Sequence, residues 1–588
     1  MNSLVALVLA LLVAFIGYSY YARYVDRNIF KSDPKKTTPA KMFMDGVDFI
    51  PAGKNVLIGY QFKSIAATGP VTGAIIAAQW GWLPAILWLF LGVLFIGWVQ
   101  DYSSAMLGVR KEGQTFTALS YRMISPRART ILLAFLYLYL LTIAGAFGNL
   151  VAGNLTNPKI PFGIISLTVL GVLAGQMIYR WKVDIMVTTL ITTLAAVVLI
   201  YLGSMPFIAN ILAVLPNDPK VLVPGTTLTV SKFFWGVAAL VFCYFGAVLP
   251  IWRFAQPINF VSFWIVALAM VLGALGIVVG HPDFTVPPVV TWDIAASGSG
   301  AMQPLWPMLF VTIACGAISG WHSLVSSSGT ARQLENEKDA LPVAGGSMLA
   351  EMILALIALV AAVATYPSFK DYLTAYTSPA GAAGVFSSGM AVLMSYVGVP
   401  QEVGVAFAGA VFVILAITVM QLVIRFMRVA TGELAGDRMP ILKNFHVSTI
   451  IALLLTMFLL ATGTFNLLWQ LFGGSNQLMA GLALMLVTIY LMSEGKPSAF
   501  VFWPMVFMLV TTTVALLVTA YNLLWANVFL KVVQGKPVDP GLAAGNVLMG
   551  LIALFLVGAA VILVYDGWKA MVSLRAGRAK TQASPAQA

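Results

Sequence analysis

The sequence predicts an all-α membrane protein that crosses the bilayer many times. Of its 588 residues, 60% are apolar and only 9% are charged, whereas about a quarter of a soluble chain is charged. The apolar residues fall in runs of about 20, the length that crosses roughly 30 Å of hydrocarbon as a helix. These runs predict about 15 transmembrane helices. The predicted spans are 3–23, 57–80, 83–109, 129–153, 163–179, 184–203, 232–252, 257–280, 303–330, 344–366, 402–427, 446–463, 467–492, 500–527 and 543–567.

The basic residues predict the orientation of these spans. The chain has 33 Lys and Arg against 21 Asp and Glu, and most of the basic residues fall on one side when the N-terminus is placed outside and the C-terminus in the cytoplasm. This asymmetry is the positive-inside rule, so the net charge indicates orientation and no nucleic-acid partner. The first run lacks the basic start and the Ala-x-Ala site of a signal peptide and is predicted to be an uncleaved helix. The run 384–396 is too short to span and is either re-entrant or interfacial.

The sequence lacks the motifs of several function classes. The sequence has no G-x-x-x-x-G-K-[ST] phosphate loop, no H-E-x-x-H and no cluster of His and Cys ligands. Its two cysteines, Cys243 and Cys315, lie inside apolar runs. We therefore expect no catalytic residues, no metal site and no cofactor. Transport driven by an ion gradient remains, with a nutrient sensor or a channel-like protein on the same fold as the alternative.

Two predicted spans are interrupted near their middles. Gly69-Pro70 breaks 57–80, and Gly246 with Pro250 interrupts 232–252. Proline removes a helical hydrogen bond, so such breaks persist only where they are buried in protein or line a cavity. Each broken span is the first of a set of five spans. Because five is an odd number, the second set crosses the membrane in the opposite orientation to the first. The chain is therefore predicted to have a five-plus-five inverted-repeat (LeuT-like) core, with one extra N-terminal and four extra C-terminal helices. The predicted units are the N-terminal helix and basic linker (1–56), the two repeats (57–203 and 232–430), the accessory helices (444–570) and a cytoplasmic tail (571–588).

The paired breaks predict where a substrate binds. Amides at the starts of half-helices favour negative charge, so a substrate carboxylate is expected near 68–71 and 246–251. His322 lies close to the predicted midplane, where a hydrogen-bonded structural histidine and a histidine that senses protons or contacts substrate both fit the pattern. The predicted substrate-binding residues are Thr68, Gly69, Pro70, Tyr244, Phe245, Gly246, Trp321 and His322.

A second set of residues is predicted to couple transport to an ion. Lys63 lies about 10 Å above the start of 57–80, at a depth similar to the hydroxyl groups near the end of 303–330. We expect Lys63 to stand where a sodium ion would otherwise bind, between the first broken helix and the hydroxyl-bearing one, and to lose and regain a proton during the cycle, which makes the protein proton-coupled. Alternatively, its long side chain reaches down to cytoplasmic water. Asp101 fits structural pairing and function equally, and Glu351 is interpreted as structural. The predicted ion-coupling residues are Lys63, Ser64, Ser326, Ser327, Ser328, Thr330 and Asp101.

Five stretches together resemble one family, the carbon starvation protein A family of bacterial inner-membrane transporters. They are TPAKMFMDGVDFIPAGKNVLIGYQFKSIAATGP, WGWLPA, VQDYSSAMLGVR, CGAISGWHSLVSSSGT and LLWQLFGGSNQLMA. The resemblance covers nearly the whole chain and alone draws attention to Asn476-Gln477. It implies uptake of short peptides or of small carboxylates such as pyruvate, a coupling ion (H⁺ or Na⁺), membrane lipids as surroundings, and kinship with the amino acid–polyamine–cation superfamily. It also implies a location in the bacterial inner membrane.

Overall fold

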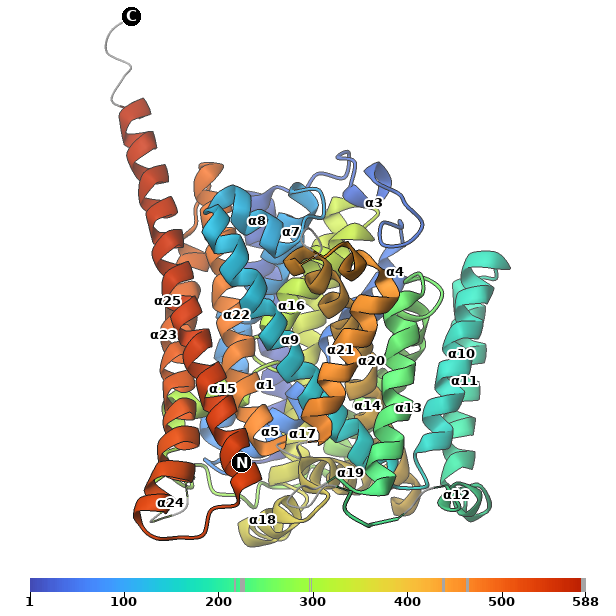
Figure 1. Ribbon diagram of the computed structural model, residues 1–588. Coiled ribbons are helices and arrows are strands. Elements are labelled where there is room, and N and C mark those ends of the chain that lie inside the picture. The colour runs from blue at the N-terminus through green and yellow to red at the C-terminus, as the bar shows by residue number, and fades with distance from the viewer. Residues whose placement is uncertain are drawn as a thin grey trace, which may run out of the picture.

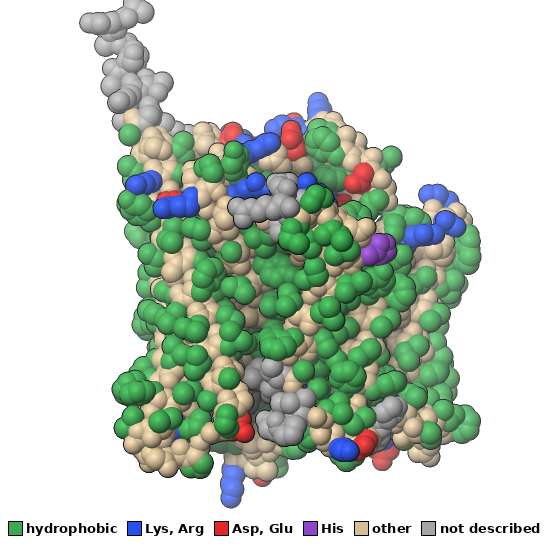
Figure 2. All heavy atoms as spheres, in the orientation of Figure 1, with side chains coloured by type: hydrophobic (Ala, Val, Ile, Leu, Met, Phe, Trp, Pro, Cys, Tyr) green, Lys and Arg blue, Asp and Glu red, His purple; other side chains and the backbone are tan. Residues whose placement is uncertain are grey.

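The computed structural model of the chain describes residues 1–215, 218–222, 228–295, 297, 299–435, 439–461 and 465–582. In Figure 1 the helices stand side by side as an upright bundle, with the N-terminus near its lower end and the last helix extending above its upper end. The face shown in Figure 2 is apolar through its middle, and charged side chains lie along its upper and lower edges. A bilayer requires this distribution, because apolar side chains face hydrocarbon and charged ones face water.

The described residues form helices joined by turns and loops, and their extended pairs are single bridges. The α-helices are α1 (Ser3–Ile16), α2 (Arg23–Val25), α3 (Pro39–Met42), α4 (Lys54–Ile65), α5 (Gly69–Ala77), α6 (Trp82–Gly92), α7 (Trp98–Arg110), α8 (Phe116–Met123), α9 (Pro126–Leu155), α10 (Pro161–Gly175), α11 (Ile185–Ser204), α12 (Pro206–Ala213), α13 (Val230–Val248), α14 (Ala255–Gly280), α15 (Phe310–Thr312), α16 (Gly320–Leu324), α17 (Gly346–Val363), α18 (Phe369–Thr377), α19 (Gly381–Ser395), α20 (Gln401–Ala435), α21 (Phe445–Ala461), α22 (Phe465–Ser493), α23 (Ala499–Tyr521), α24 (Leu530–Val533) and α25 (Pro540–Gln582).

Twelve helical runs among the described residues are long and apolar enough to cross a membrane. Each corresponds to one predicted span, and the three other predicted spans are broken or short: 57–80, 303–330 and 446–463. The last of these is α21, and its predicted end, 462–463, lies outside the described residues. The short run 384–396 overlaps α19, an apolar helix of 15 residues that ends at Ser395 and packs against α17 and α20.

The predicted cytoplasmic tail begins inside the last helix. The tail predicted at 571–588 is helical as far as Gln582, because α25 continues beyond the membrane-spanning run. Residues 583–588 lie outside the described residues.

The predicted break in 57–80 is present. α4 ends at Ile65, and the chain leaves helical geometry at Ala66, whose ψ is 84°. α5 begins at Gly69 with Pro70 in its first turn, where proline's missing N–H costs no helical hydrogen bond. Every residue from 59 to 75 is buried, as is required of an unwound backbone at membrane depth.

A second break lies in 303–330. α15 ends at Thr312, residues 313–319 are non-helical, and α16 begins at Gly320. No proline marks this break, but its glycines allow close approach of other helices. An added Cβ would lie 2.7 Å from the Ala355 Cβ at Gly316 and 2.3 Å from the Asn476 carbonyl oxygen at Gly320.

The prediction that 232–252 is the second interrupted helix is wrong. α13 is a regular helix from Val230 to Val248, and Gly246 lies inside it. Pro250 follows the end of that helix, where a proline has no helical hydrogen bond to remove. Gly246 instead allows α20 to approach closely, since an added Cβ would lie 2.5 Å from Oε1 of Gln421.

The two breaks pack directly against each other. A Cβ added at Gly69 would lie 2.4 Å from Sγ of Cys315, and one added at Gly73 would lie 2.3 Å from the backbone oxygen of Thr312. Real Cβ atoms do not approach other atoms so closely, so both contacts require glycine. The unwound segments of 57–80 and 303–330 therefore meet inside the bundle.

The helices around the breaks pack against one another in pairs. α9 packs along α20, and α13 packs along α21. The further contacting pairs are α4 with α14, α16 with α22, α5 with α17, η6 (Val325–Gly329) with α7, α9 with α13, α20 with α21, α9 with α22 and α20 with α14. α10 and α11 form a hairpin at the edge of the bundle that packs on α14 (Figure 1).

Candidate functional site

Four ionisable side chains are buried around the two breaks. Lys63 comes from α4, Asp101 from α7, His322 from α16 and Glu351 from α17, and each is 0% exposed. Ionisable groups are expensive to bury and rare within membrane-spanning helices, where they indicate functional sites by default. We call these four residues the charge cluster.

His322 lies between two carboxylates. Its Nδ1 is 3.1 Å from Oδ2 of Asp101, and its Nε2 is 3.3 Å from Oε2 of Glu351. An imidazole carries a proton on both ring nitrogens only in its charged form. The charged ring therefore carries an N–H on each side, one hydrogen-bonded to Asp101 and the other at ion-pair distance from Glu351, whereas the neutral ring leaves one carboxylate facing a bare nitrogen.

Lys63 is held by the first break and by α20. Its ammonium donates to the backbone oxygen of Ala66, 3.1 Å away, and to Oγ1 of Thr418, 2.6 Å away. Backbone oxygens freed at an unwound turn are the ligands with which broken transporter helices hold coupling ions. The ammonium therefore occupies a position chemically suited to a small monovalent cation.

The charge cluster is balanced by a single proton. With Lys63 and His322 both charged, two cations face two carboxylates and the cluster is neutral. Loss of one proton leaves a net negative charge in an environment where uncompensated charge is strongly unfavourable. The arrangement can therefore hold a proton when the site is closed and release it when water or another charged group enters.

The hydroxyl groups after α16 are engaged with α4. Gln61 Nε2 donates to Oγ of Ser326 at 2.9 Å, and Gln61 Oε1 accepts from Oγ1 of Thr330. Ser327 donates at 2.7 Å to a backbone oxygen of its own helix. Lys63, two residues further along α4 than Gln61, faces Thr418 of α20 rather than these hydroxyls.

Asn476 of α22 joins the second break to the rest of the bundle. Its Oδ1 accepts hydrogen bonds from the Tyr139 hydroxyl at 2.6 Å, the Ser319 hydroxyl at 3.1 Å and the Trp321 backbone N–H at 3.1 Å. Trp321 in turn donates from Nε1 to the backbone oxygen of Ser64, 2.7 Å away. This chain of contacts satisfies backbone groups that the two breaks leave without helical partners.

A cavity of about 270 Å³ opens beside the ends of the half-helices. Its lining includes Gln79 just after α5, Thr312 at the end of α15 and Gly473 of α22. Amide, hydroxyl and aromatic groups line it, and none of its lining residues is charged. The full lining is Ile76, Gln79, Ile294, Gln303, Met308, Val311, Thr312, Tyr376, Trp469, Gln470 and Gly473.

The sequence matches the family model described as carbon starvation protein CstA over residues 2–376 and 370–515. The chain belongs to the carbon starvation protein CstA family. Together with its many apolar helices, this membership makes it a multi-pass membrane protein of a transporter family.

Relatives in this family carry two kinds of name. The pyruvate/proton symporter BtsT of Escherichia coli is 31% identical over 374 residues, which cover 63% of this chain and 50% of the symporter, so the match spans about half of that relative. The peptide transporter CstA of Escherichia coli is 27% identical over 552 residues, covering 83% of this chain and 77% of the relative. The peptide transporter CstA of Bacillus subtilis is 27% identical over 534 residues, covering 84% and 86%.

A similarity to solved structures is more distant. The crystal structure of a manganese transporter from Eremococcus coleocola aligns with 90% of this chain and 99% of its own, with 13% identity and a TM-score of 0.45.

The structure brings many of the predicted site residues of this family member together. Thr68, Gly69 and Pro70 form the start of α5 at the first break, and Ser64 lies just before that break. Trp321 and His322 begin the half-helix after the second break, beside Lys63 and Asp101 through the contacts described above. The four predicted hydroxyl residues are buried along the continuation of the same half-helix: Ser326, Ser327, Ser328 and Thr330.

Three predicted residues lie elsewhere. The hydroxyl of Tyr244 is 2.7 Å from Nδ1 of the exposed His446, and Phe245 is 44% exposed. Gly246 packs on Gln421 of α20. They fall away from the breaks because α13 is continuous and directs these positions toward α20, α21 and the outside of the bundle.

Sequence reasoning missed three members of the site. Glu351, interpreted as structural, completes the charge cluster; the signal in the sequence was a lone acid within the apolar run 346–363. Thr418 gave no signal, since buried threonines in membrane helices commonly bond their own backbone. Asn476 was noticeable only through the family resemblance, because its partners are far away in the sequence.

Proposed function

We propose that the chain is a secondary-active, proton-coupled importer of small carboxylates such as pyruvate, or of short peptides. Family membership and the names of its relatives, a pyruvate/proton symporter and several peptide transporters, support transport of this substrate class. The observation that carries the coupling mechanism is the buried charge cluster around the two breaks. We further propose the bacterial inner membrane as its location, with the N-terminus outside and the C-terminus in the cytoplasm.

The charge cluster supplies the coupling step in this proposal. In the closed state one proton keeps Lys63, Asp101, His322 and Glu351 neutral overall, and His322 shares it with its two flanking carboxylates. Opening toward the cytoplasm admits water, which stabilises the separated charges and lets the proton leave. The emptied cluster then returns to the outward-open state, where the next proton binds.

Lys63 acts as a fixed cation in this cycle. Its ammonium bridges Ala66 at the unwound turn and Thr418 of α20, so it ties the first broken helix to a neighbouring helix. A sodium ion would compete for the same oxygen atoms, and we therefore propose that the protein does not depend on sodium. Weakening this bridge would allow one bundle of helices to rock against the other.

We propose a revised five-plus-five core for the fifteen-span architecture. The first repeat comprises 57–80, α6–α7, α9, α13 and α14, with the hairpin of α10 and α11 inserted. The second comprises 303–330, α17, α20, α21 and α22. The helix contacts support this division, because exchange of corresponding helices converts α4–α14 into α15–α22, α5–α17 into η6–α7 and α9–α13 into α20–α21. Each repeat then begins with a broken helix.

The substrate carboxylate is proposed to bind at Thr68, Gly69 and Pro70. The start of α5 presents unpaired backbone amides, and the helix dipole there favours an anion. Oγ1 of Thr68 is buried without a hydrogen-bond partner, so it has a donor to offer. We propose that the neutral cavity beside Thr312 is the start of the route to this point from the predicted outer side. A small carboxylate suits this route better than a dipeptide, whose ammonium would find no acid in the cavity lining.

Uptake into liposomes tests the proposal. The purified full-length protein should accumulate labelled pyruvate, or a labelled dipeptide, in sodium-free buffer when the outside is more acidic, and a protonophore should abolish this. Glu351→Gln should lose accumulation, whereas Glu335→Gln, a matched change at a half-exposed acid, should retain it. Accumulation that requires sodium or ignores the protonophore would overturn proton coupling. No uptake of either substrate would favour a sensor.

A further inference from the structure

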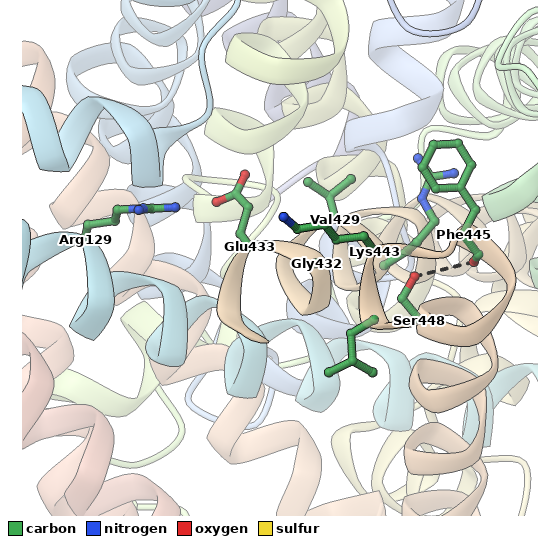
Figure 3. Close-up of a pocket in the computed structure, with 9 residues that line it drawn as sticks. Arg129, Val429, Gly432, Glu433, Lys443, Phe445 and Ser448 are labelled. Atoms are coloured by element: carbon green, nitrogen blue, oxygen red, sulfur yellow. Dashed lines mark hydrogen bonds between the residues drawn. The ribbon is translucent and has the colours of Figure 1, made fainter. Parts of the chain in front are cut away.

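A second cavity, of about 360 Å³, lies at the end of the bundle away from the substrate route. It is bounded by the start of α9, the end of α20, the short turn η10 (Pro440–Lys443) and the start of α21. These are helix ends that the basic residues place at the cytoplasmic surface. Its lining residues are Arg129, Arg428, Val429, Gly432, Glu433, Leu442, Lys443, Phe445 and Ser448 (Figure 3).

The cavity is predominantly basic. Three of its side chains, Arg129, Arg428 and Lys443, are basic, and one, Glu433, is acidic. Figure 3 shows Arg129 and Lys443 pointing from opposite sides toward Glu433. The Glu433 carboxylate also accepts hydrogen bonds from Thr117 at 2.6 Å and from Thr115 at 3.5 Å, which holds it toward α8. Among the described lining residues, basic side chains therefore outnumber acidic ones by three to one.

Arg428 has donors left for a ligand. It is only 4% exposed, and its Nη1 donates to the backbone oxygen of Ala247 at 2.7 Å. Its guanidinium lies 4.3 Å from the centre of the Phe445 ring. Its Nε is buried and has no hydrogen-bond partner among the described residues. A buried donor of a charged group is costly when unpaired, so an anion in this cavity would satisfy it.

The rim of the cavity is apolar. Phe445 is 54% exposed, Val429 is 37% exposed and Ile441, in the adjoining turn, is 62% exposed. α21 continues from this rim into the membrane with exposed apolar side chains such as Leu454. A basic floor under an apolar rim at the membrane surface matches the two ends of an anionic lipid.

We propose that this cavity binds a phosphate group, carried by an anionic phospholipid headgroup or free in the cytosol. Arginine is the preferred partner of phosphate because its guanidinium donates several hydrogen bonds in one plane. The site is separate from the charge cluster and does not depend on the proposed transport cycle. It joins α9, α20 and α21, so a bound phosphate holds together the helices that pack behind the two breaks.

Thermal unfolding of the purified full-length protein tests this site. The protein is titrated with phosphatidylglycerol, phosphatidylcholine or inorganic phosphate, and the unfolding temperature is measured. A ligand that binds only the folded state raises that temperature. We expect phosphatidylglycerol to raise it and phosphatidylcholine not to. A rise with inorganic phosphate as well would assign the site to free phosphate.

The test variant is Arg129→Gln with Lys443→Gln, because Arg428 also bonds to α13 and its loss endangers folding. The matched control is Lys35→Gln with Lys36→Gln, which removes the same charge from an exposed loop. We expect the test variant to lose at least half of the ligand-induced rise and the control to keep it. An equal rise in both variants, or no rise of the wild-type protein with either phosphate ligand, would overturn the proposal.

Discussion

The contact between the two breaks predicts the effect of a single added methyl group. In Gly69→Ala the new Cβ would lie 2.4 Å from Sγ and 2.8 Å from Cβ of Cys315. Carbon atoms pack at about 3.5–4.0 Å, so the overlap exceeds roughly 1 Å. Gly69 and Cys315 are both buried in a region packed on all sides. Overpacking of this kind costs about 1–3 kcal/mol, and we expect a loss of that size in stability together with a loss of uptake.

A second substitution separates this clash from other effects of alanine. Cys315→Gly removes both atoms that the new methyl group meets, so Gly69→Ala with Cys315→Gly should recover part of the stability that the first change loses. The two changes should therefore be non-additive in a double-mutant cycle. Gly558→Ala in α25, where an added Cβ meets nothing within 4 Å, serves as the control. Thermal unfolding and uptake are measured for each variant. Wild-type behaviour of Gly69→Ala, or strict additivity with Cys315→Gly, would refute the packing argument.

Two further predictions concern contacts outside the charge cluster. Asn476→Ala removes an oxygen that accepts three buried hydrogen bonds. We expect a loss of about 1–3 kcal/mol per unsatisfied group at most, seen as a lower unfolding temperature; an unchanged unfolding temperature would contradict this. Asp48 pairs with Arg425 at 2.6 Å on the predicted cytoplasmic side. Burial alone would raise the pKa of Asp48, but the charge and hydrogen bond of Arg425, together with the charges of Arg332 and Arg428, outweigh burial and lower that pKa. The pair's contribution to the free energy of unfolding should therefore be full at pH 7 and disappear as the pH falls below about 3.9. The stability difference between wild type and Asp48→Asn should shrink over that range. A difference that is constant with pH would contradict this prediction.

The sequence allowed most of the membrane-spanning helices to be predicted, because each needs a long apolar run and little else. Gly69-Pro70 also located the first break, since a proline in the middle of an apolar run cannot continue a regular helix. Pro250 led to a wrong prediction because the sequence locates the end of a span only to within a few residues. A shift of that size decides whether a proline interrupts a helix or follows it. The second break has no proline, and only the small residues of CGAISG mark it.

The site was predictable where a residue is unusual for its surroundings and not where its role depends on distant partners. Lys63 and His322 stand out as ionisable residues inside apolar runs. The partner of Lys63 could not be predicted in this way. The crossing of three helices decides which face of α4 meets α20 and which face meets the helix of Ser326. Gln61, only two residues away, takes the contact predicted for Lys63.

Substrate is proposed to enter together with a proton held by the charge cluster, and proton movement tests this coupling most directly. The protein is reconstituted in sodium-free liposomes that contain a pH-sensitive dye, and pyruvate or a dipeptide is added outside. We predict acidification of the interior that depends on substrate and protein, and that is lost in Lys63→Met and Glu351→Gln while both variants remain folded and monodisperse. Substrate uptake by wild type without acidification, or undiminished acidification in Lys63→Met, would contradict proton coupling through the charge cluster.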